Sequence, residues 1–231
     1  WEILENIRDE SLELDDRTDA VDDMKRLAES GDPYAQYCIG KLYRDGDPLI
    51  PNSEFAKFAL RDAAQQGLAA AQYALGKLYL SDDIEVHNAE LGMQWLEQAA
   101  KNGHTFAAYL LGKEYLKGAN TEKNADKALD WFTRSAKHGN PYAQYMLGKM
   151  YLEGIGVAQD KSQGLYWLSE SAKQGHPYAS VAMERSNSTT PLSVFCAVNR
   201  ILHHMSRIFR DNSLPRSQPG GIQIDRKRWA E

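Results

Sequence analysis

Small and aromatic residues recur along this chain at a fixed step of 36 residues. Glycine occurs five times at that step, alanine and tyrosine follow the same step at several other positions, and tryptophan occurs at it three times (Gly31, Gly67, Gly103, Gly139, Gly175; Ala35, Ala71, Ala107, Ala143, Ala179; Tyr37, Tyr73, Tyr109, Tyr145; Trp95, Trp131, Trp167). A chain with such a period folds as stacked similar units, each burying its apolar face against its neighbours. The period therefore predicts an elongated array in place of a single globular core.

Each unit is predicted to be a pair of helices. The first helix begins just after the repeat glycine, where Asp32-Pro33 and Asn140-Pro141 supply a capping side chain followed by proline. The second begins at a side chain that also suits a helix start, again every 36 residues (Asn52, Asn88, Asn124, Asp160). It ends at the next repeat glycine, which suits the left-handed position after a helix. The fold class is thus all-α, an α/α solenoid of helix-turn-helix units.

Four further glycines lie inside the first helices, where glycine costs about 1 kcal/mol relative to alanine. They also recur every 36 residues (Gly40, Gly76, Gly112, Gly148). We expect them to permit a close approach of the paired second helix, with small partners at Ala64, Ala100, Ala136 and Ala172. Tyrosine and tryptophan side chains are expected to fill the space between units.

The pattern Ala-x-Tyr-x-x-Gly-x-x-Tyr followed by x-x-Trp-x-x-x-Ala-Ala resembles the Sel-1-like repeat. One unit shows it at Ala71, Tyr73, Gly76, Tyr79, Trp95, Ala99 and Ala100, and residues 143–172 show it again. Ala59 replaces the tryptophan in the first unit, and the loop Ser81-Asp82-Asp83 lacks its glycine. The resemblance implies a right-handed superhelix similar to tetratricopeptide arrays, used mainly as a binding scaffold for a protein or peptide.

Four parts of the chain are expected. Residues 1–17 form an acidic N-terminal capping helix, and residues 18–183 form the solenoid, with four full repeats and a half repeat at each end. Residues 184–211 form a C-terminal capping helix that hides the open end of the core. Residues 212–231 form a flexible basic tail, since proline, glycine and serine precede a run of basic residues there.

Composition excludes several classes of protein. No run of 18 apolar residues occurs, so no membrane span is expected, and two cysteines cannot make a disulfide framework. The sequence has no glycine-rich phosphate loop, no Gly-x-Ser-x-Gly, no His-Glu-x-x-His and no Cys-x-x-Cys. We therefore expect no enzymatic activity, no cofactor, no metal and no small-molecule substrate. Cys38 falls in an apolar slot and is expected to be a packed thiol, and no specific role is expected for His104 or His176.

A row of lysines is the strongest candidate for a binding surface. Lys41, Lys77, Lys113 and Lys149 each follow a helix-interior glycine. First helices usually line the concave face of such arrays, so these lysines predict a positive groove for an acidic peptide or a C-terminal carboxylate. The alternative is a solvated helix edge, in which lysine recurs only because the repeat was duplicated. Aromatic and amide contacts are expected from the neighbouring residues Tyr34, Phe106, Tyr178, Gln36, Gln72 and Gln144.

The charge of the chain is unevenly distributed. Residues 1–32 have 12 acidic and 4 basic side chains, whereas residues 199–231 have 7 basic and 3 acidic. An acidic body argues against nucleic-acid binding there, but Arg226, Lys227 and Arg228 in the tail could contact DNA phosphates non-specifically. The alternative for the tail is a solvated terminus without a role.

A second, shorter resemblance concerns residues 203–228. The run His203 to Asp211, a Pro/Gly linker and Ile224 to Arg228 are similar to the C-terminal region of mobilisation-type relaxases of Gram-positive conjugative elements. It implies that the chain is the accessory, cytoplasmic part of a larger DNA-processing protein, and the first residue, Trp1, fits a fragment. A free-standing bacterial regulatory adaptor is the alternative.

Overall fold

The structure, a computed structural model, describes residues 2–8, 14–46, 48–83 and 85–187. These residues contain eleven α-helices and no strand, which confirms the predicted all-α class. The helices are α1 (Glu2–Arg8), α2 (Leu14–Glu29), α3 (Pro33–Asp45), α4 (Ser53–Gln65), α5 (Ala69–Tyr79), α6 (Ala89–Lys101), α7 (Thr105–Lys117), α8 (Ala125–Lys137), α9 (Pro141–Glu153), α10 (Lys161–Lys173) and α11 (Ala179–Asn187).

The predicted capping residues set the helix starts. Asp32 and Asn140 accept hydrogen bonds from backbone N–H groups in the first turns of α3 and α9. The second helices α4, α6, α8 and α10 begin in the same way, at the four side chains that recur every 36 residues (Asn52, Asn88, Asn124, Asp160). Each such cap satisfies a backbone donor that the helix itself cannot pair.

The repeat glycines occupy the left-handed turn that follows each second helix. Gly31, Gly67, Gly103, Gly139 and Gly175 have φ between 79° and 94°. The Gly31 N–H donates to the Ala28 carbonyl at 3.0 Å, and the next N–H reaches back to Leu27 at 3.2 Å. Only glycine adopts this backbone at little cost, so the turn into the next unit recurs wherever the glycine does.

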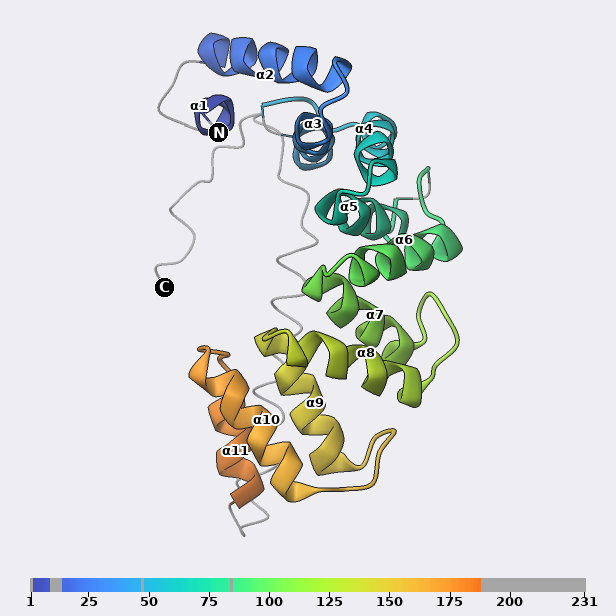
Figure 1. Cartoon of the computed structure of the whole chain (residues 1–231), viewed down its shortest axis with the longest axis vertical. Coiled ribbons are helices and arrows are strands. Elements are labelled where there is room, and N and C mark those ends of the chain that lie inside the picture. The colour runs from blue at the N-terminus through green and yellow to red at the C-terminus, as the bar shows by residue number, and fades with distance from the viewer. Residues whose placement is uncertain (1, 9–13, 47, 84, 188–231) are drawn as a thin grey trace, which may run out of the picture. The chain divides into compact units, whose positions relative to one another are not determined.

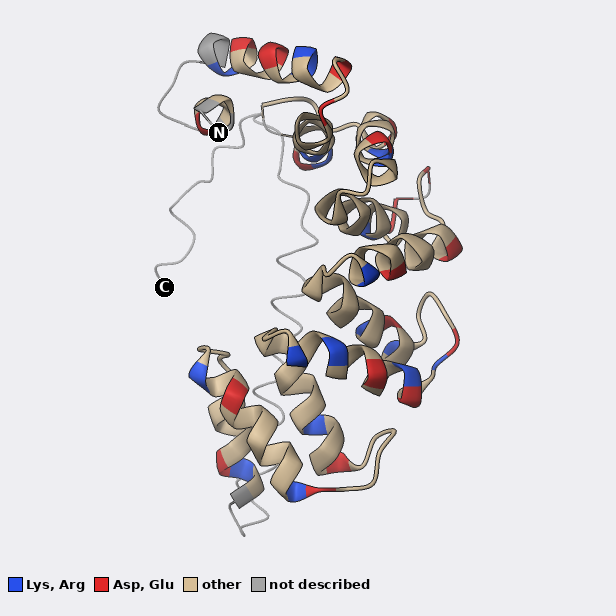
Figure 2. Cartoon of the chain, viewed as in Figure 1, with Lys and Arg blue, Asp and Glu red and all other residues tan. Residues whose placement is uncertain are grey.

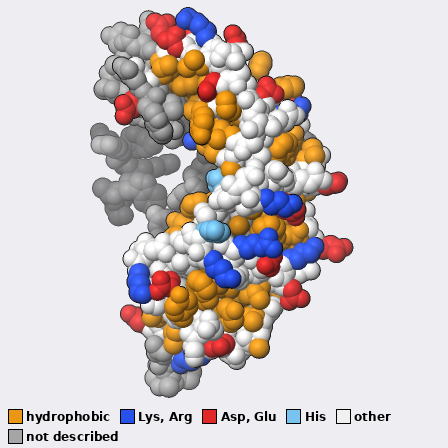
Figure 3. All heavy atoms as spheres, viewed as in Figure 1, with side chains coloured by type: hydrophobic (Ala, Val, Ile, Leu, Met, Phe, Trp, Pro, Cys, Tyr) orange, Lys and Arg blue, Asp and Glu red, His pale blue; other side chains and the backbone are white. Residues whose placement is uncertain are grey.

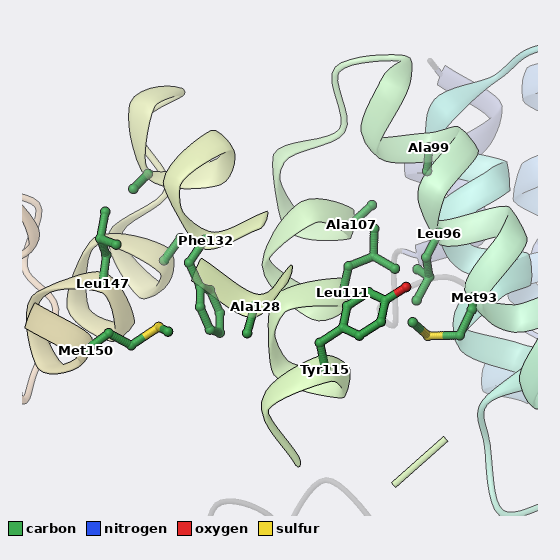
Figure 4. Close-up of a cluster of buried hydrophobic side chains, with 12 residues drawn as sticks. Met93, Leu96, Ala99, Ala107, Leu111, Tyr115, Ala128, Phe132, Leu147 and Met150 are labelled. Atoms are coloured by element: carbon green, nitrogen blue, oxygen red, sulfur yellow. The ribbon is translucent and has the colours of Figure 1, made fainter. Parts of the chain in front are cut away.

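The helices form hairpins that follow one another in chain order, from α3–α4 to α9–α10 (Figure 1). The closest packing lies within each hairpin and between a second helix and the next first helix. The largest core cluster draws its buried side chains from four successive helices, α6 to α9, and partly buried side chains of α5 and α10 pack against it. In Figure 4, Leu96 and Met93 point toward Leu111, and Phe132 lies farther along the same core. The core is thus continuous along the stack.

The helix-interior glycines permit the expected close approach, but their predicted partners are wrong. A Cβ on Gly76 would stand 2.8 Å from Leu96 Cγ and 3.0 Å from the Gly92 carbonyl oxygen, and one on Gly112 would stand 2.8 Å from the Phe132 ring. The partner is therefore a large residue one helical turn before the predicted alanine (Leu60, Leu96, Phe132, Leu168). Glycine is needed because a bulky side chain from the paired helix fills the place of its Cβ.

The two ends of the described chain differ from the full units. At the N-terminal end, Ile7 of α1 is buried against Val21 and Met24 of α2, and α2 begins four residues before the predicted solenoid boundary at residue 18. At the C-terminal end, α11 packs beside α10 through Ala179 and Ala182. The predicted cap at 184–211 lies almost wholly outside the described residues, as does the basic tail at 212–231.

Candidate functional site

The predicted lysines lie beside tyrosines of the same helices. Lys41 Nζ lies 5.7 Å from the centre of the Tyr37 ring, and Lys77 Nζ lies 5.8 Å from the Tyr73 ring. We call this row the tyrosine–lysine ladder (Tyr37, Tyr73, Tyr109, Tyr145; Lys41, Lys77, Lys113, Lys149). Figure 2 shows a basic segment on each of α3, α5, α7 and α9. An ammonium over an aromatic face is attracted to the ring, which orients the lysine side chain.

Two ladder lysines lie on adjacent first helices, and Lys77 affects the pKa of Lys113. Partial loss of hydration lowers the pKa of Lys77, although its side chain is exposed, and Arg44 lowers it further. Loss of hydration also lowers the pKa of Lys113, and repulsion from Lys117 and Lys77 adds to the effect. These cations thus share one surface, where an incoming anion would be stabilised.

The outer members of the ladder have different surroundings. Lys149 forms an ion pair with Glu153 at 3.6 Å on its own helix, whereas Lys41 is half-buried beside Tyr37. The tyrosines beneath are partly buried, and burial raises the pKa of Tyr109 to about 12. The rings therefore stay neutral near neutral pH and present a π face to the cations.

An exposed aromatic row begins near the start of the first helices. Tyr34 is 65% exposed, and Phe106 and Tyr142 are each 45% exposed. The rings of Phe106 and Tyr142 lie 6.2 Å apart, and Tyr142 also lies 5.9 Å from the ladder tyrosine Tyr109. The aromatic row (Tyr34, Phe106, Tyr142, Tyr178) thus meets the ladder between α7 and α9. Tyr142 was missed in the sequence, although it stands exactly one period after Phe106.

His104 and His176 have specific structural positions, so the expectation of no specific role is wrong. The His104 ring stacks on Tyr73 at 4.4 Å, and its Nδ1 accepts the Ala107 N–H at 3.2 Å. His176 stacks on Tyr145 at 4.5 Å and touches Tyr142 edge-on at 5.2 Å. Burial lowers the pKa of both imidazoles. The sequence did contain a signal for this, because His104 and His176 occupy the same position of the 36-residue period as the helix caps Asp32 and Asn140.

Two of the three predicted glutamines are buried, and all three bond within the chain. Gln72 is 2% exposed and Gln144 is 5% exposed. Gln72 donates to the Ala64 carbonyl at 3.1 Å and accepts from the Asn102 amide at 2.9 Å. Gln36 is less buried and bonds in the same way. The structure therefore does not bring these amides together with the lysines on an accessible surface.

The described residues contain no group of three or more His, Cys, Asp or Glu side chains that could hold a metal ion. None of the described helices has both the length and the apolar character that crossing a bilayer requires. Cys38 is a half-buried thiol packed against the core of α1 to α3. Arg226, Lys227 and Arg228 lie outside the described residues.

The repeat itself decides the family. The model of the Sel1 repeat matches residues 33–68, 69–104, 105–140 and 141–176 without a gap. The chain belongs to the Sel1 repeat family. The four matched Sel1 repeats have the predicted 36-residue period, in a frame that begins two residues later than the units defined by the repeat glycines. Sel1 repeat proteins generally mediate protein–protein interactions.

Two solved structures resemble the fold over most of the chain. One is the structure of c5321, a protective antigen of uropathogenic Escherichia coli with an SLR fold, which has 30% sequence identity to this chain and a TM-score of 0.72. The match covers 78% of this chain and 38% of the c5321 chain. The other is a Sel1 repeat protein from Oxalobacter formigenes, with 32% sequence identity and a TM-score of 0.64. This match covers 72% of this chain and 49% of the Oxalobacter chain. The chain thus spans less than half of either structure. No curated protein matches it.

Proposed function

We propose that this Sel1 repeat chain is a non-enzymatic scaffold that binds an acidic polypeptide along its first helices. The observation that supports the proposal is that Lys77 and Lys113 lie on adjacent first helices, where Lys77 lies beside the Tyr73 ring and repulsion from Lys77 contributes to the lowered pKa of Lys113. A carboxylate placed between them would relieve the repulsion and replace part of the lost hydration.

The remaining contacts of the proposed surface come from rings. The aromatic row meets the ladder at Tyr109 and Tyr142, so a bound segment would lie over apolar ring surface as well as charge. Aromatic side chains often supply most of the energy of a protein interface. Lys41 and Lys149 would extend the surface to the outer units, whereas Gln36, Gln72 and Gln144 have no part in it because their amides are bonded inside the chain.

The test uses a labelled synthetic peptide of alternating Glu and Phe and its Gln/Phe counterpart. Lys77→Glu/Lys113→Glu should weaken binding of the Glu/Phe peptide by about tenfold or more. The matched control is Lys123→Glu/Lys161→Glu, which reverses two exposed charges outside the ladder. Equal binding by the wild type and the ladder variant, or equal binding of the two peptides, would show that the ladder is a solvated helix edge.

The accessory role in a conjugation relaxase, with its cytoplasmic location, remains a prediction from the sequence. So does contact of Arg226, Lys227 and Arg228 with DNA, since these residues lie outside the described part of the chain. The basic composition of the segment favours phosphate contact that weakens steeply with salt. Retention on immobilised duplex DNA should be lost on deletion of residues 212–231, and unchanged retention would contradict the prediction.

A further inference from the structure

A repeated side-chain bridge, which we call the amide tie, joins three successive helices in most units. A glutamine of the first helix donates to a carbonyl near the end of the preceding second helix. Its oxygen accepts from an amide at the end of its own second helix, 30 residues later. The tie occurs around α3, α5 and α9 (Gln36 with Ala28 and Gln66; Gln72 with Ala64 and Asn102; Gln144 with Ala136 and Gln174).

The unit that begins with α7 cannot form this tie. The glutamine position is Ala108, whose side chain ends at Cβ, and the amide position is His138. A pocket of about 110 Å³ opens here, and its lining includes Ala100, Ala108 and His138. These are the counterparts of the three residues that a tie joins, so the pocket is the space that a glutamine side chain fills elsewhere.

The chemistry around this pocket favours an anion. Lys101 and Arg134 line it together with Thr105, the first residue of α7, and Trp131. Arg134 lies 4.7 Å above the Trp131 ring and uses one nitrogen to pair with Asp130 at 2.9 Å. The N-terminal end of α7 and the two cations attract negative charge, and the full charges of the cations outweigh the partial negative charges at the C-terminal ends of α6 and α8 beside them. Figure 3 shows basic side chains gathered over α6 and α8, the helices that provide Lys101 and Arg134.

We propose that the Ala108 pocket binds a carboxylate of the polypeptide partner. The carboxylate would occupy the space of the missing glutamine, and because it has no hydrogen to donate to the Ala100 carbonyl, Lys101 and Arg134 would hold it. Two sources share this chemistry: an Asp or Glu side chain within the partner, and the partner's C-terminal carboxylate. The proposal rests on the proposed scaffold function, and it adds a fixed anchor point away from the ladder lysines.

The experiment is an NMR titration of the full chain at low salt with three small probes. N-acetylglutamate N-methylamide presents a side-chain carboxylate, N-acetylglycine a terminal carboxylate, and N-acetylglutamine N-methylamide a neutral amide of similar shape. The carboxylates should shift the Trp131 indole signal and the Thr105 and Ala108 amide signals. Their affinity should exceed that of the neutral probe by about fivefold or more, because hydrogen bonds between charged groups are stronger.

Variants test whether the probes occupy this pocket. Ala108→Gln restores the glutamine of the other units and should reduce carboxylate affinity by about tenfold. Ala158→Gln, which adds the same side chain at an exposed loop position, should leave it unchanged. If Ala108→Gln does not fold, Lys101→Gln serves in its place and should weaken the carboxylates but not the neutral probe.

The relative affinity of the two carboxylate probes identifies the source of the anchor. Absence of shifts with both carboxylates, equal affinity for the neutral probe, or undiminished binding by Ala108→Gln would each overturn the proposal. Lys77→Glu/Lys113→Glu should leave binding of these probes intact. The ladder test therefore remains valid if the pocket proposal is contradicted, and the pocket titration remains interpretable if the ladder proposal is contradicted.

Discussion

At the scale of single residues, Gly76 shows how one missing side chain sets the distance between two helices. The place of its Cβ is taken by Leu96 and by the Gly92 carbonyl oxygen of the paired helix. Alanine is favoured over glycine in a helix by about 1 kcal/mol, but here the added methyl group must displace backbone as well as a buried leucine. Steric crowding therefore outweighs helix propensity.

We predict that Gly76→Ala lowers the free energy of unfolding by about 1–3 kcal/mol. Urea denaturation followed by circular dichroism measures this change. Gly103→Asn is the contrasting variant, because nothing lies within 4 Å of a Cβ there and asparagine tolerates a positive φ. A higher free energy of unfolding for Gly76→Ala would contradict the prediction, because the two helices could then move apart without loss of stability.

The partly buried His104 and the buried His176 make stability depend on pH. Their pKa values are lowered in the folded chain, so the unfolded chain takes up protons first. Stability should therefore be complete above about pH 6.5 and decrease as pH falls below it. His104→Asn/His176→Asn places at both positions the residue that caps α9 at Asn140. We predict that the melting temperature falls less for this variant than for the wild type between about pH 7.5 and about pH 5.5. Equal losses would assign the acid sensitivity to other groups.

At the scale of helices, the amide tie couples each first helix to the second helices on both sides of it. Gln72 and Ala64 are both buried, so removal of the Gln72 amide takes a hydrogen-bond donor from the Ala64 carbonyl where water cannot easily replace it. We predict that Gln72→Ala costs about 1–3 kcal/mol in chemical denaturation. Gln36→Ala is the matched control, since Gln36 and the Ala28 carbonyl to which it donates are only partly buried and the loss should be smaller. Equal losses would show that burial does not decide the strength of the tie.

The helices themselves could be predicted from the sequence, whereas contacts across them could not. The capping side chains, the proline at the start of α3 and α9 and the turn glycines are local signals, and the structure has them in place. The partner of Gly76 depends on how far one helix slides along the other, which a period does not fix. Likewise, periodicity places Gln72 on a helix, but only the packed neighbours determine that its amide is buried.

At the scale of the whole described chain, a disturbance should spread only to neighbouring units. Leu111 is fully buried between α6 and α8, and the main packing joins helices consecutive in the chain. We predict that Leu111→Ala costs about 2–5 kcal/mol. Hydrogen exchange should increase first in α6, α7 and α8, while α3 and α4 keep their protection. A uniform increase over all described helices would instead indicate one cooperative unit.

The 30-residue spacing of the ties also bears on how such a gene can change in length. In each tie the carbonyl lies 8 residues before the glutamine and the amide 30 residues after it, so a tie reaches only from one unit into the end of the preceding unit. Duplication or deletion of 36 codons therefore adds or removes one complete set of partners and keeps every other set paired. An insertion of any other length between the partners of a tie changes their spacing. Growth of the coding sequence by whole periods is thus the change that this architecture accommodates most readily.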